Sequence, residues 1–251
     1  MSALCLTLGF SGLAGAESQV SVTTGLDYSS GQYGTDRTTE IWYLPVIGKL
    51  ETGDWQFKLV VPYLRMRSPS GGVIVGYDGN GTPIRSGAGA PVTVSGLGDV
   101  VASATYALVS SPRYMLDVTT KLKVGTASRD KGLGTGENDL GLVLDAYFPM
   151  EALTPFISVG YRKPGDPPGQ KIHNTRQAEI GLAYKLSPSW SAGIMYDWRS
   201  ASSSAGSAQR DISAYGVYKL APAWKLQAYV SHGFSEASAD WGGGMMLTHG
   251  F

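Results

Sequence analysis

Polar and apolar side chains alternate along most of the chain, in segments separated by glycine, proline and serine. From Gln177 to Leu186 every even-numbered residue is apolar, and a similar alternation recurs from Trp190 to Arg199. A period of two residues is typical of β-strands whose two faces meet different surroundings. The pattern predicts strands over residues 19–30, 38–50, 55–67, 98–109, 114–127, 139–149, 154–163, 176–186, 190–200, 210–220, 224–234 and 240–251.

The connections between these segments alternate between tight and long. The tight ones are residues 51–54, 110–113, 150–153, 187–189 and 221–223, and the long ones are 31–37, 68–97, 128–138, 164–175, 201–209 and 235–239. Outer-membrane barrels combine strands of about 9–11 residues with short periplasmic turns and longer external loops. A soluble β-protein shows the same period, but not this order of loop lengths. We therefore expect an all-β, transmembrane antiparallel β-barrel of about twelve strands.

Tryptophans mark the predicted edges of the membrane. Trp55, Trp190 and Trp224 follow tight turns, and Trp198 and Trp241 lie beside long loops. The amphipathic indole ring is favoured at such an interface. Only 16% of the residues are charged, yet no apolar run reaches the roughly 18 residues that a membrane-spanning helix needs. The 20 basic and 20 acidic residues cancel, so we expect no nucleic-acid partner. The order of loop lengths and the positions of the tryptophans predict a bacterial outer-membrane location.

Both ends of the sequence carry targeting features. Residues 4–13 are apolar, and Ala14-Gly15-Ala16 fits a signal-peptidase site. We expect residues 1–16 to be a signal peptide, truncated at its start because a basic segment is missing, and residues 17–251 to be the outer-membrane barrel. Phe251 closes an alternating segment, as in outer-membrane barrels whose last strand is recognised by the assembly machinery.

An enzyme is the first alternative, because some twelve-stranded outer-membrane barrels hydrolyse lipids with a Ser, His and carboxylate or amide set. Of the three histidines, His173 lies in a predicted loop without a nucleophile motif, and His249 shares the lipid-facing side of its strand with Phe251. His232 is adjacent to Ser231, and adjacent strand residues face opposite sides. We therefore expect no enzyme, no metal site and no cofactor.

The polar side of each predicted strand is expected to line the interior of the barrel. Lysines on this side gather near tight turns, and several aspartates lie near the long loops. Such charges either form salt bridges that solvate a narrow interior or line a channel that steers charged solute groups. The expected lumen-lining residues are Asp27, Lys58, Asp117, Lys121, Lys123, Asp145, Tyr147, Glu179, Lys185, Asp197, Arg199, Asp211, Lys219 and Lys225.

The connection 68–97 is unusually long for a structureless segment, and such loops tend to be functional. Residues 73–77 and 82–85 flank Asp78-Gly79-Asn80-Gly81, which predicts a hairpin. This hairpin could extend the third and fourth strands above the membrane, or fold inward and narrow the pore. We favour the extension.

Several short motifs resemble an outer-membrane barrel family that is named for the meta-pathway of phenol degradation. They are Tyr43–Val46, Gly96–Val100 and Gly134–Asp139, together with the repeated Tyr-Lys-Leu-x-Pro-x-Trp segments at 184–190 and 218–224. The resemblance spans most of residues 38–251. It implies an outer-membrane channel, with hydrophobic or aromatic compounds among its solutes.

A barrel of twelve strands is wider than the eight-stranded type that side chains fill, and narrower than open porins. We expect a channel for passive uptake of small organic solutes, with outer-membrane lipid and lipopolysaccharide as surroundings. The alternative is a non-conducting structural or adhesive barrel that acts through its external loops. The sequence leaves open the identity of the solute and whether the lumen is open or plugged.

Overall fold

The computed structural model describes residues 18–34, 37–70, 73–77, 82–86, 89–169, 171–204 and 206–251. The expected signal peptide, residues 1–16, and the predicted hairpin turn at 78–81 lie outside these residues. No helix of the described residues is long and apolar enough to cross a membrane.

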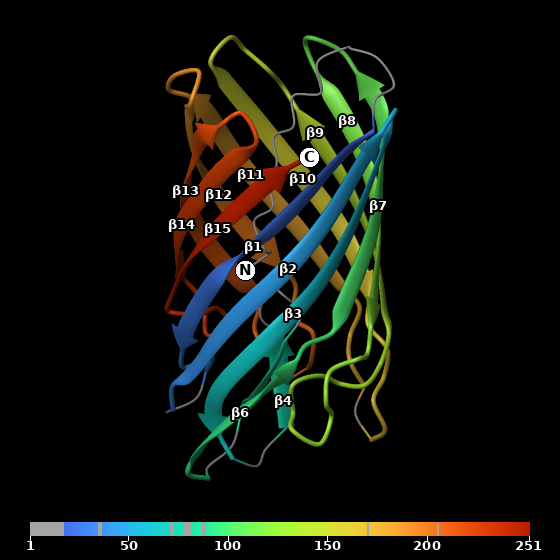
Figure 1. The fold of residues 1–251 in the computed structure, drawn as a ribbon. Coiled ribbons are helices and arrows are strands. Elements are labelled where there is room, and N and C mark those ends of the chain that lie inside the picture. Colours follow the sequence, from blue (N-terminus) through green and yellow to red (C-terminus); the bar gives the residue numbers. More distant parts are fainter. Residues whose placement is uncertain are drawn as a thin grey trace.

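The chain forms one closed antiparallel barrel, in which β1 pairs with both β2 and β15 (Figure 1). Successive strands pair with each other, except that β6 and β7 both pair with β3, and β4 and β5 pair only with each other. The strands are β1 (Gln19–Gly31), β2 (Thr39–Thr52), β3 (Trp55–Pro69), β4 (Val73–Tyr77), β5 (Pro83–Ser86), β6 (Pro91–Leu97), β7 (Val100–Ser110), β8 (Met115–Val124), β9 (Asp139–Tyr147), β10 (Leu153–Lys163), β11 (Thr175–Lys185), β12 (Trp190–Arg199), β13 (Gln209–Ala221), β14 (Trp224–Gly233) and β15 (Trp241–Gly250). Since β6 and β7 share one position and β4–β5 stand apart, the barrel has the expected twelve strand positions.

The expected strand bounds differ most from the structure at the fourth strand position, and the predicted strand 114–127 also runs three residues past the end of β8 at Val124. The prediction began the fourth strand at residue 98, whereas β6 already pairs with residues 63–69 of β3, and β7 pairs with residues 55–60. Gly98 interrupts the strand, and a Cβ there would lie 2.9 Å from side-chain atoms of Leu64 and Pro62. Because glycine and proline dominate the preceding segment, its strand character was not visible as alternation.

The predicted hairpin in the long connection is present as β4 paired with β5. Its position differs from the favoured extension, which β6 provides instead along β3. Ile84 of β5 is 1% exposed and packs against Tyr33 of the β1–β2 connection and Ala239 of the β14–β15 connection. The hairpin therefore packs against neighbouring loops at the rim of the barrel.

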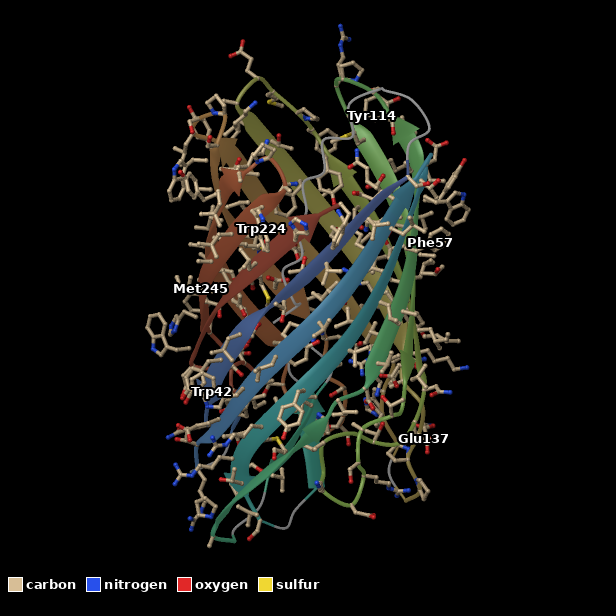
Figure 2. The ribbon with its side chains drawn as sticks, in the orientation of Figure 1. Trp42, Phe57, Tyr114, Glu137, Trp224 and Met245 are labelled. Carbon is tan, nitrogen blue, oxygen red and sulfur yellow. The ribbon has the colours of Figure 1, made fainter. Side chains whose placement is uncertain are left out.

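The two rims of the barrel differ, and we call them the tight-turn end and the long-loop end. At the tight-turn end, hydroxyls of Ser111 and Ser187 each accept two backbone N–H groups within their turns. The N–H of Phe251 donates to the carbonyl of Val20, so the described ends of the chain meet at this rim. Tyr114 marks the tight-turn end in Figure 2, and Glu137 marks the long-loop end.

The outer surface of the wall is apolar between two aromatic zones. Exposed Val, Leu, Ile and Met side chains alternate with inward ones along the strands, and Figure 2 shows Phe57 and Met245 on opposite sides of the barrel. At the tight-turn end the ring of Trp190 lies 4.5 Å from that of Tyr218. At the long-loop end Trp42 lies 4.5 Å from Tyr28. An apolar belt between aromatic girdles is the outer surface that a membrane barrel requires.

Candidate functional site on the inner wall

The fourteen side chains expected in the lumen all lie on the strand face opposite to the exposed apolar side chains. They do not form one uniform lining. The cross-strand registers place them in an acidic row, a lysine-rich wall and an aromatic cluster. Two further residues, Asp27 and Lys123, are bonded to buried partners.

The acidic row runs across six neighbouring strands, from β8 to β13. Each carboxylate is the direct cross-strand partner of the next, except that Ser158 of β10 stands between two of them. The row consists of Asp117, Asp145, Glu179, Asp197 and Asp211. Like charges directly opposite each other destabilise a sheet, so strand pairing does not explain this arrangement.

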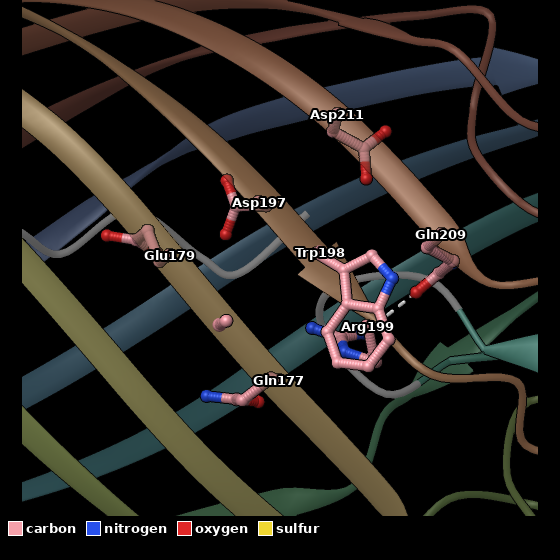
Figure 3. A pocket seen from close by; sticks show the side chains of 8 residues that line it. Gln177, Glu179, Asp197, Trp198, Arg199, Gln209 and Asp211 are labelled. Carbon is pink, nitrogen blue, oxygen red and sulfur yellow. Dashed lines mark hydrogen bonds between the residues drawn. The ribbon is translucent and has the colours of Figure 1, made fainter.

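A small pocket lies along the end of this row (Figure 3). It is lined by Gln177, Ala178, Glu179, Asp197, Trp198, Arg199, Gln209 and Asp211. Arg199 Nη1 donates to Gln209 Oε1 at 3.1 Å, and Gln209 Nε2 donates to the carbonyl of Ala237 at 2.9 Å. The pocket thus combines carboxylates, amides and one guanidinium, which can hydrogen-bond a polar solute.

A lysine-rich wall continues from the β8 end of the acidic row over β7, β3 and β2. Lys58 is the cross-strand partner of Lys49 and of Ser103, and Ser103 is the partner of Lys121. Lys121 interacts electrostatically with Asp145, and also with Glu179 and Arg199, which lie three and four strand positions further around the barrel. Lys121 is also exposed to solvent. It therefore stands in a water-accessible interior that the acidic row shares.

More lysines occupy the interior near the tight-turn end. Lys219 and Lys225 are direct cross-strand partners. Lys225 interacts electrostatically with Lys49 and Glu51 as well as with Lys219. Lys49 Nζ lies 2.9 Å from Glu51 Oε2. Lys185, which is also exposed, completes the set at this end.

An aromatic cluster fills the interior beside the acidic row. Its members are all at most 7% exposed and come from β10, β12, β13 and β14. They are Phe156, Met195, Tyr215 and Tyr229, with Tyr147 of β9 packed against them. Phe156 precedes Ser158 by two positions, and Met195 precedes Asp197 by two. Both strands run from a tight turn toward a long loop, so the two side chains lie on the tight-turn side of the acidic row.

Three rings of this cluster lie over glycines of neighbouring strands. Phe156 lies over Gly181, Tyr215 over Gly193 and Tyr229 over Gly244, and a Cβ on each glycine would come within 3.0 Å of the ring. We call these three pairs the ring seats. Because a glycine has no side chain, each ring can lie along the wall instead of across the lumen.

Asp27 faces the interior as expected, but it is a bonded group. It is 3% exposed and accepts a hydrogen bond from the hydroxyl of Tyr229. Gly244 is the cross-strand partner of both residues, so the Tyr229 side chain crosses β15 to reach β1. Asp27 thus links β1 to β14 through a hydrogen bond and is not part of the charged lining.

Lys123 is likewise a bonded group, 6% exposed. Its Nζ lies 2.6 Å from Asp99 Oδ2 and 3.3 Å from Asp139 Oδ2. Arg162 pairs with the same oxygen of Asp139. The sequence reasoning missed Asp99, Asp139 and Arg162, although Asp99 and Asp139 lie in the motifs that carry the family resemblance. Those motifs meet here in one buried charge network.

This network holds the connection between β8 and β9 against the inner wall. Asp99 Oδ1 accepts the N–H of Ala127 at 2.9 Å, and Asn138 Oδ1 accepts the N–H of Gly125 at 3.0 Å. Leu133, 1% exposed, packs in an apolar cluster with Ile41, Tyr43, Leu64, Met66 and Ala127. Since Leu64 and Met66 face inward near the end of β3, this packing places Leu133 against the inner wall at the long-loop end.

The histidines of the described residues make other contacts. His232 Nδ1 lies 2.7 Å from the carbonyl oxygen of Asp240, and the N–H of His173 donates to the carbonyl of Ser202. His249 stacks 4.4 Å from Trp224 on the outer face. In the part of the chain that the structure describes, no group of three His, Cys, Asp or Glu side chains could hold a metal ion.

Comparisons with known proteins agree with this architecture. A family model described as "Putative MetA-pathway of phenol degradation" matches residues 12–251. The fold resembles the COG4313 outer membrane channel from Pseudomonas putida F1, with a TM-score of 0.69, 14% identity, and coverage of 96% of this chain and 97% of that one. It also resembles the KdgM porin, with a TM-score of 0.55, 9% identity, and coverage of 92% and 99%. No curated protein sequence matches the chain.

Proposed function

We propose that this chain, which belongs to the family described as "Putative MetA-pathway of phenol degradation", is an outer-membrane channel for passive uptake of small organic solutes. The apolar outer belt between aromatic girdles suits a bilayer. The long-loop end faces the outside, and the tight-turn end with Phe251 faces the periplasm. Residues 1–16 are the signal peptide that directs export. The assembly machinery then recognises the last strand.

One observation carries the proposal: a charged, water-accessible interior runs beside a packed aromatic cluster. The aromatic cluster closes one side of the interior, with side chains at most 7% exposed. Lys121 remains exposed on the other side, within electrostatic reach of Glu179 and Arg199. If side chains filled the whole interior, this lysine would be buried against apolar groups, which is costly for a charge. Its exposure therefore supports a water-filled path. The opposed charges support a narrow path that orients polar solutes.

Solutes of this path are small organic molecules that carry a polar group. The pocket between Gln177 and Asp211 offers both hydrogen-bond donors and acceptors on the inner wall. Aromatic side chains flank the same region, and rings stack favourably on rings. A hydroxylated or otherwise polar aromatic compound therefore fits best, in keeping with the pathway for which the family is named.

The second candidate is a non-conducting barrel that acts through its external loops. The packing of Leu133 against Leu64 and Met66 favours this alternative, because it places the connection between β8 and β9 against the inner wall at the long-loop end. Ile84 is buried against Tyr33 and Ala239, so the external connections at the same rim pack against one another.

Single-channel recording in planar bilayers separates the two candidates. The channel reading expects discrete conductance steps, smaller than those of a general porin, that are reduced by a phenolic solute added on the long-loop side. Liposome swelling should be faster with phenol than with a sugar of larger size. Absence of conductance, both in the native protein and after Leu133→Ala opens the entrance, would leave the non-conducting barrel as the correct reading.

A further inference from the structure

Basic side chains on the outer face of the barrel strands all lie at the long-loop end. In the described strands, outward-facing Lys and Arg occur only in the long-loop portions of β3, β10, β11 and β13. These residues are Arg65, Arg67, Lys163, Arg176 and Arg210. The tight-turn ends of the same strands carry Trp, Tyr, Phe and Leu on that face. A general need for solubility would not produce this asymmetry.

Three of these residues form one patch, which we call the outer cationic patch: Lys163, Arg176 and Arg210. Arg176 is the cross-strand partner of Tyr161, which lies two residues before Lys163 on β10. Arg210 is the partner of Trp198. The three cations therefore border an aromatic zone that sets the level of the membrane interface.

The outer cationic patch has no internal counter-charge. All three side chains are exposed, and none makes an ion pair with a described residue. On the other side of the barrel, Arg67 Nη1 lies 3.3 Å from Glu40 Oε2. Glu40 is the single outward-facing acid of the described barrel strands, and β9 to β14 have none. Unpaired charge at the edge of a hydrocarbon layer is costly unless anionic groups lie close by.

We propose that Lys163, Arg176 and Arg210 bind phosphate groups of the glycolipid in the outer leaflet of the outer membrane. The inference rests on the proposed membrane location and orientation. A guanidinium offers a planar fork of donors that matches phosphate oxygens, and Lys adds a point charge. The N–H of Arg176 donates to Ser200 Oγ at 2.9 Å, which fixes the start of β11 beside the patch. The ligand is an anion confined to the leaflet at the long-loop end.

The test measures binding of bisphosphorylated lipid A to the detergent-folded protein by native mass spectrometry. The variant Lys163→Gln, Arg176→Gln, Arg210→Gln should bind it roughly a hundred-fold more weakly, because each Lys or Arg near an anionic lipid surface contributes about five-fold. The matched control is Lys185→Gln, Lys219→Gln, Lys225→Gln, which removes the same charge from the interior. The control variant should bind like the native protein.

Dephosphorylated lipid A should bind native protein as weakly as the patch variant binds the phosphorylated form. Equal losses in the patch and control variants, or equal binding of the dephosphorylated lipid, would overturn the site. Phosphatidylglycerol binding as tightly as lipid A would overturn the assignment to the glycolipid. A heat-dependent shift in gel migration verifies that each variant is folded. Conductance of the patch variant tests the channel separately, so loss of the channel proposal would leave this result standing.

Discussion

The hydroxyl of Tyr229 donates a hydrogen bond to the carboxylate of Asp27, although the two residues are 202 positions apart in sequence. Tyr229 belongs to β14 and Asp27 to β1, and the Tyr229 side chain crosses β15 at Gly244. The bond therefore joins the last strands to the first across the seam where the barrel closes. It explains why β15 has a glycine at this position, since a Cβ on Gly244 would lie 2.8 Å from the Tyr229 ring.

The first prediction concerns this seam. Tyr229→Phe keeps the ring but removes the hydroxyl, so the buried Asp27 loses one donor. We expect the free energy of unfolding to fall by about 1–3 kcal/mol, the usual cost of removing one partner of a buried hydrogen bond. Urea unfolding in detergent, followed by heat-modifiable gel migration, measures it. Tyr218→Phe on the outer face is the control, and equal stability of both variants would refute a role for the seam bond.

The second prediction concerns the ring seats. Gly193→Ala would place a Cβ against the Tyr215 ring and within 2.6 Å of the carbonyl oxygen of Leu182. We expect a loss of about 1–3 kcal/mol through overpacking, together with a smaller conductance because the ring is displaced inward. Gly141→Ala is the inward-facing control, since its Cβ would lie 3.4 Å from Lys121 Cβ. Unchanged conductance and stability in Gly193→Ala would contradict the proposed role of the ring seats in packing and in the width of the path.

The third prediction concerns the entrance. Leu133→Ala removes the side chain that anchors the connection between β8 and β9, so we expect a larger single-channel conductance. The free energy of unfolding should fall by about 2–5 kcal/mol, as for other buried Leu→Ala changes. Leu97→Ala is the control, because Leu97 is 60% exposed on the outer face. A conductance identical to the native value would show that Leu133 does not narrow the path.

The fourth prediction concerns ion selectivity. Lys58→Glu combined with Lys121→Glu reverses the charge of the lysine-rich wall, while Lys123 is kept because it is locked between Asp99 and Asp139. We expect the reversal potential in a salt gradient to move toward cation selectivity. The control is Arg113→Glu in an exposed tight turn. A reversal potential that shifts no more than in this control would place the ion path away from Lys121.

Much of the barrel could be predicted from the sequence, because strand membership follows from a local period of two and from turn residues. Alternation from Gln177 to Leu186 predicted both the bounds of β11 and the side of the wall that each residue faces. The β6 segment was missed because Pro91, Gly96 and Gly98 weaken the alternation there. Inward orientation of the charged residues followed from the same local period.

The partners of those charges could not be predicted, because register in a closed barrel depends on all twelve strand positions together. Asp27 and Tyr229 belong to different ends of the chain, so only closure brings them together. Lys123 was expected to line the lumen from its inward position alone, and its ion pairs with Asp99 and Asp139 were missed because both partners are distant in sequence. The inward packing of Leu133 depends on a loop, where periodicity carries no information.

The ring seats have a consequence for how such a barrel can change over evolutionary time. At Gly181, Gly193 and Gly244 a missing methyl group, and no charged residue, lets an aromatic ring lie against the wall. Each seat lies on a different strand, so each can be altered by a single codon without touching the carboxylates or lysines of the opposing walls. Size discrimination and charge discrimination are therefore separable traits in this architecture, and a descendant can acquire a narrower or wider bore while preferring the same kind of solute.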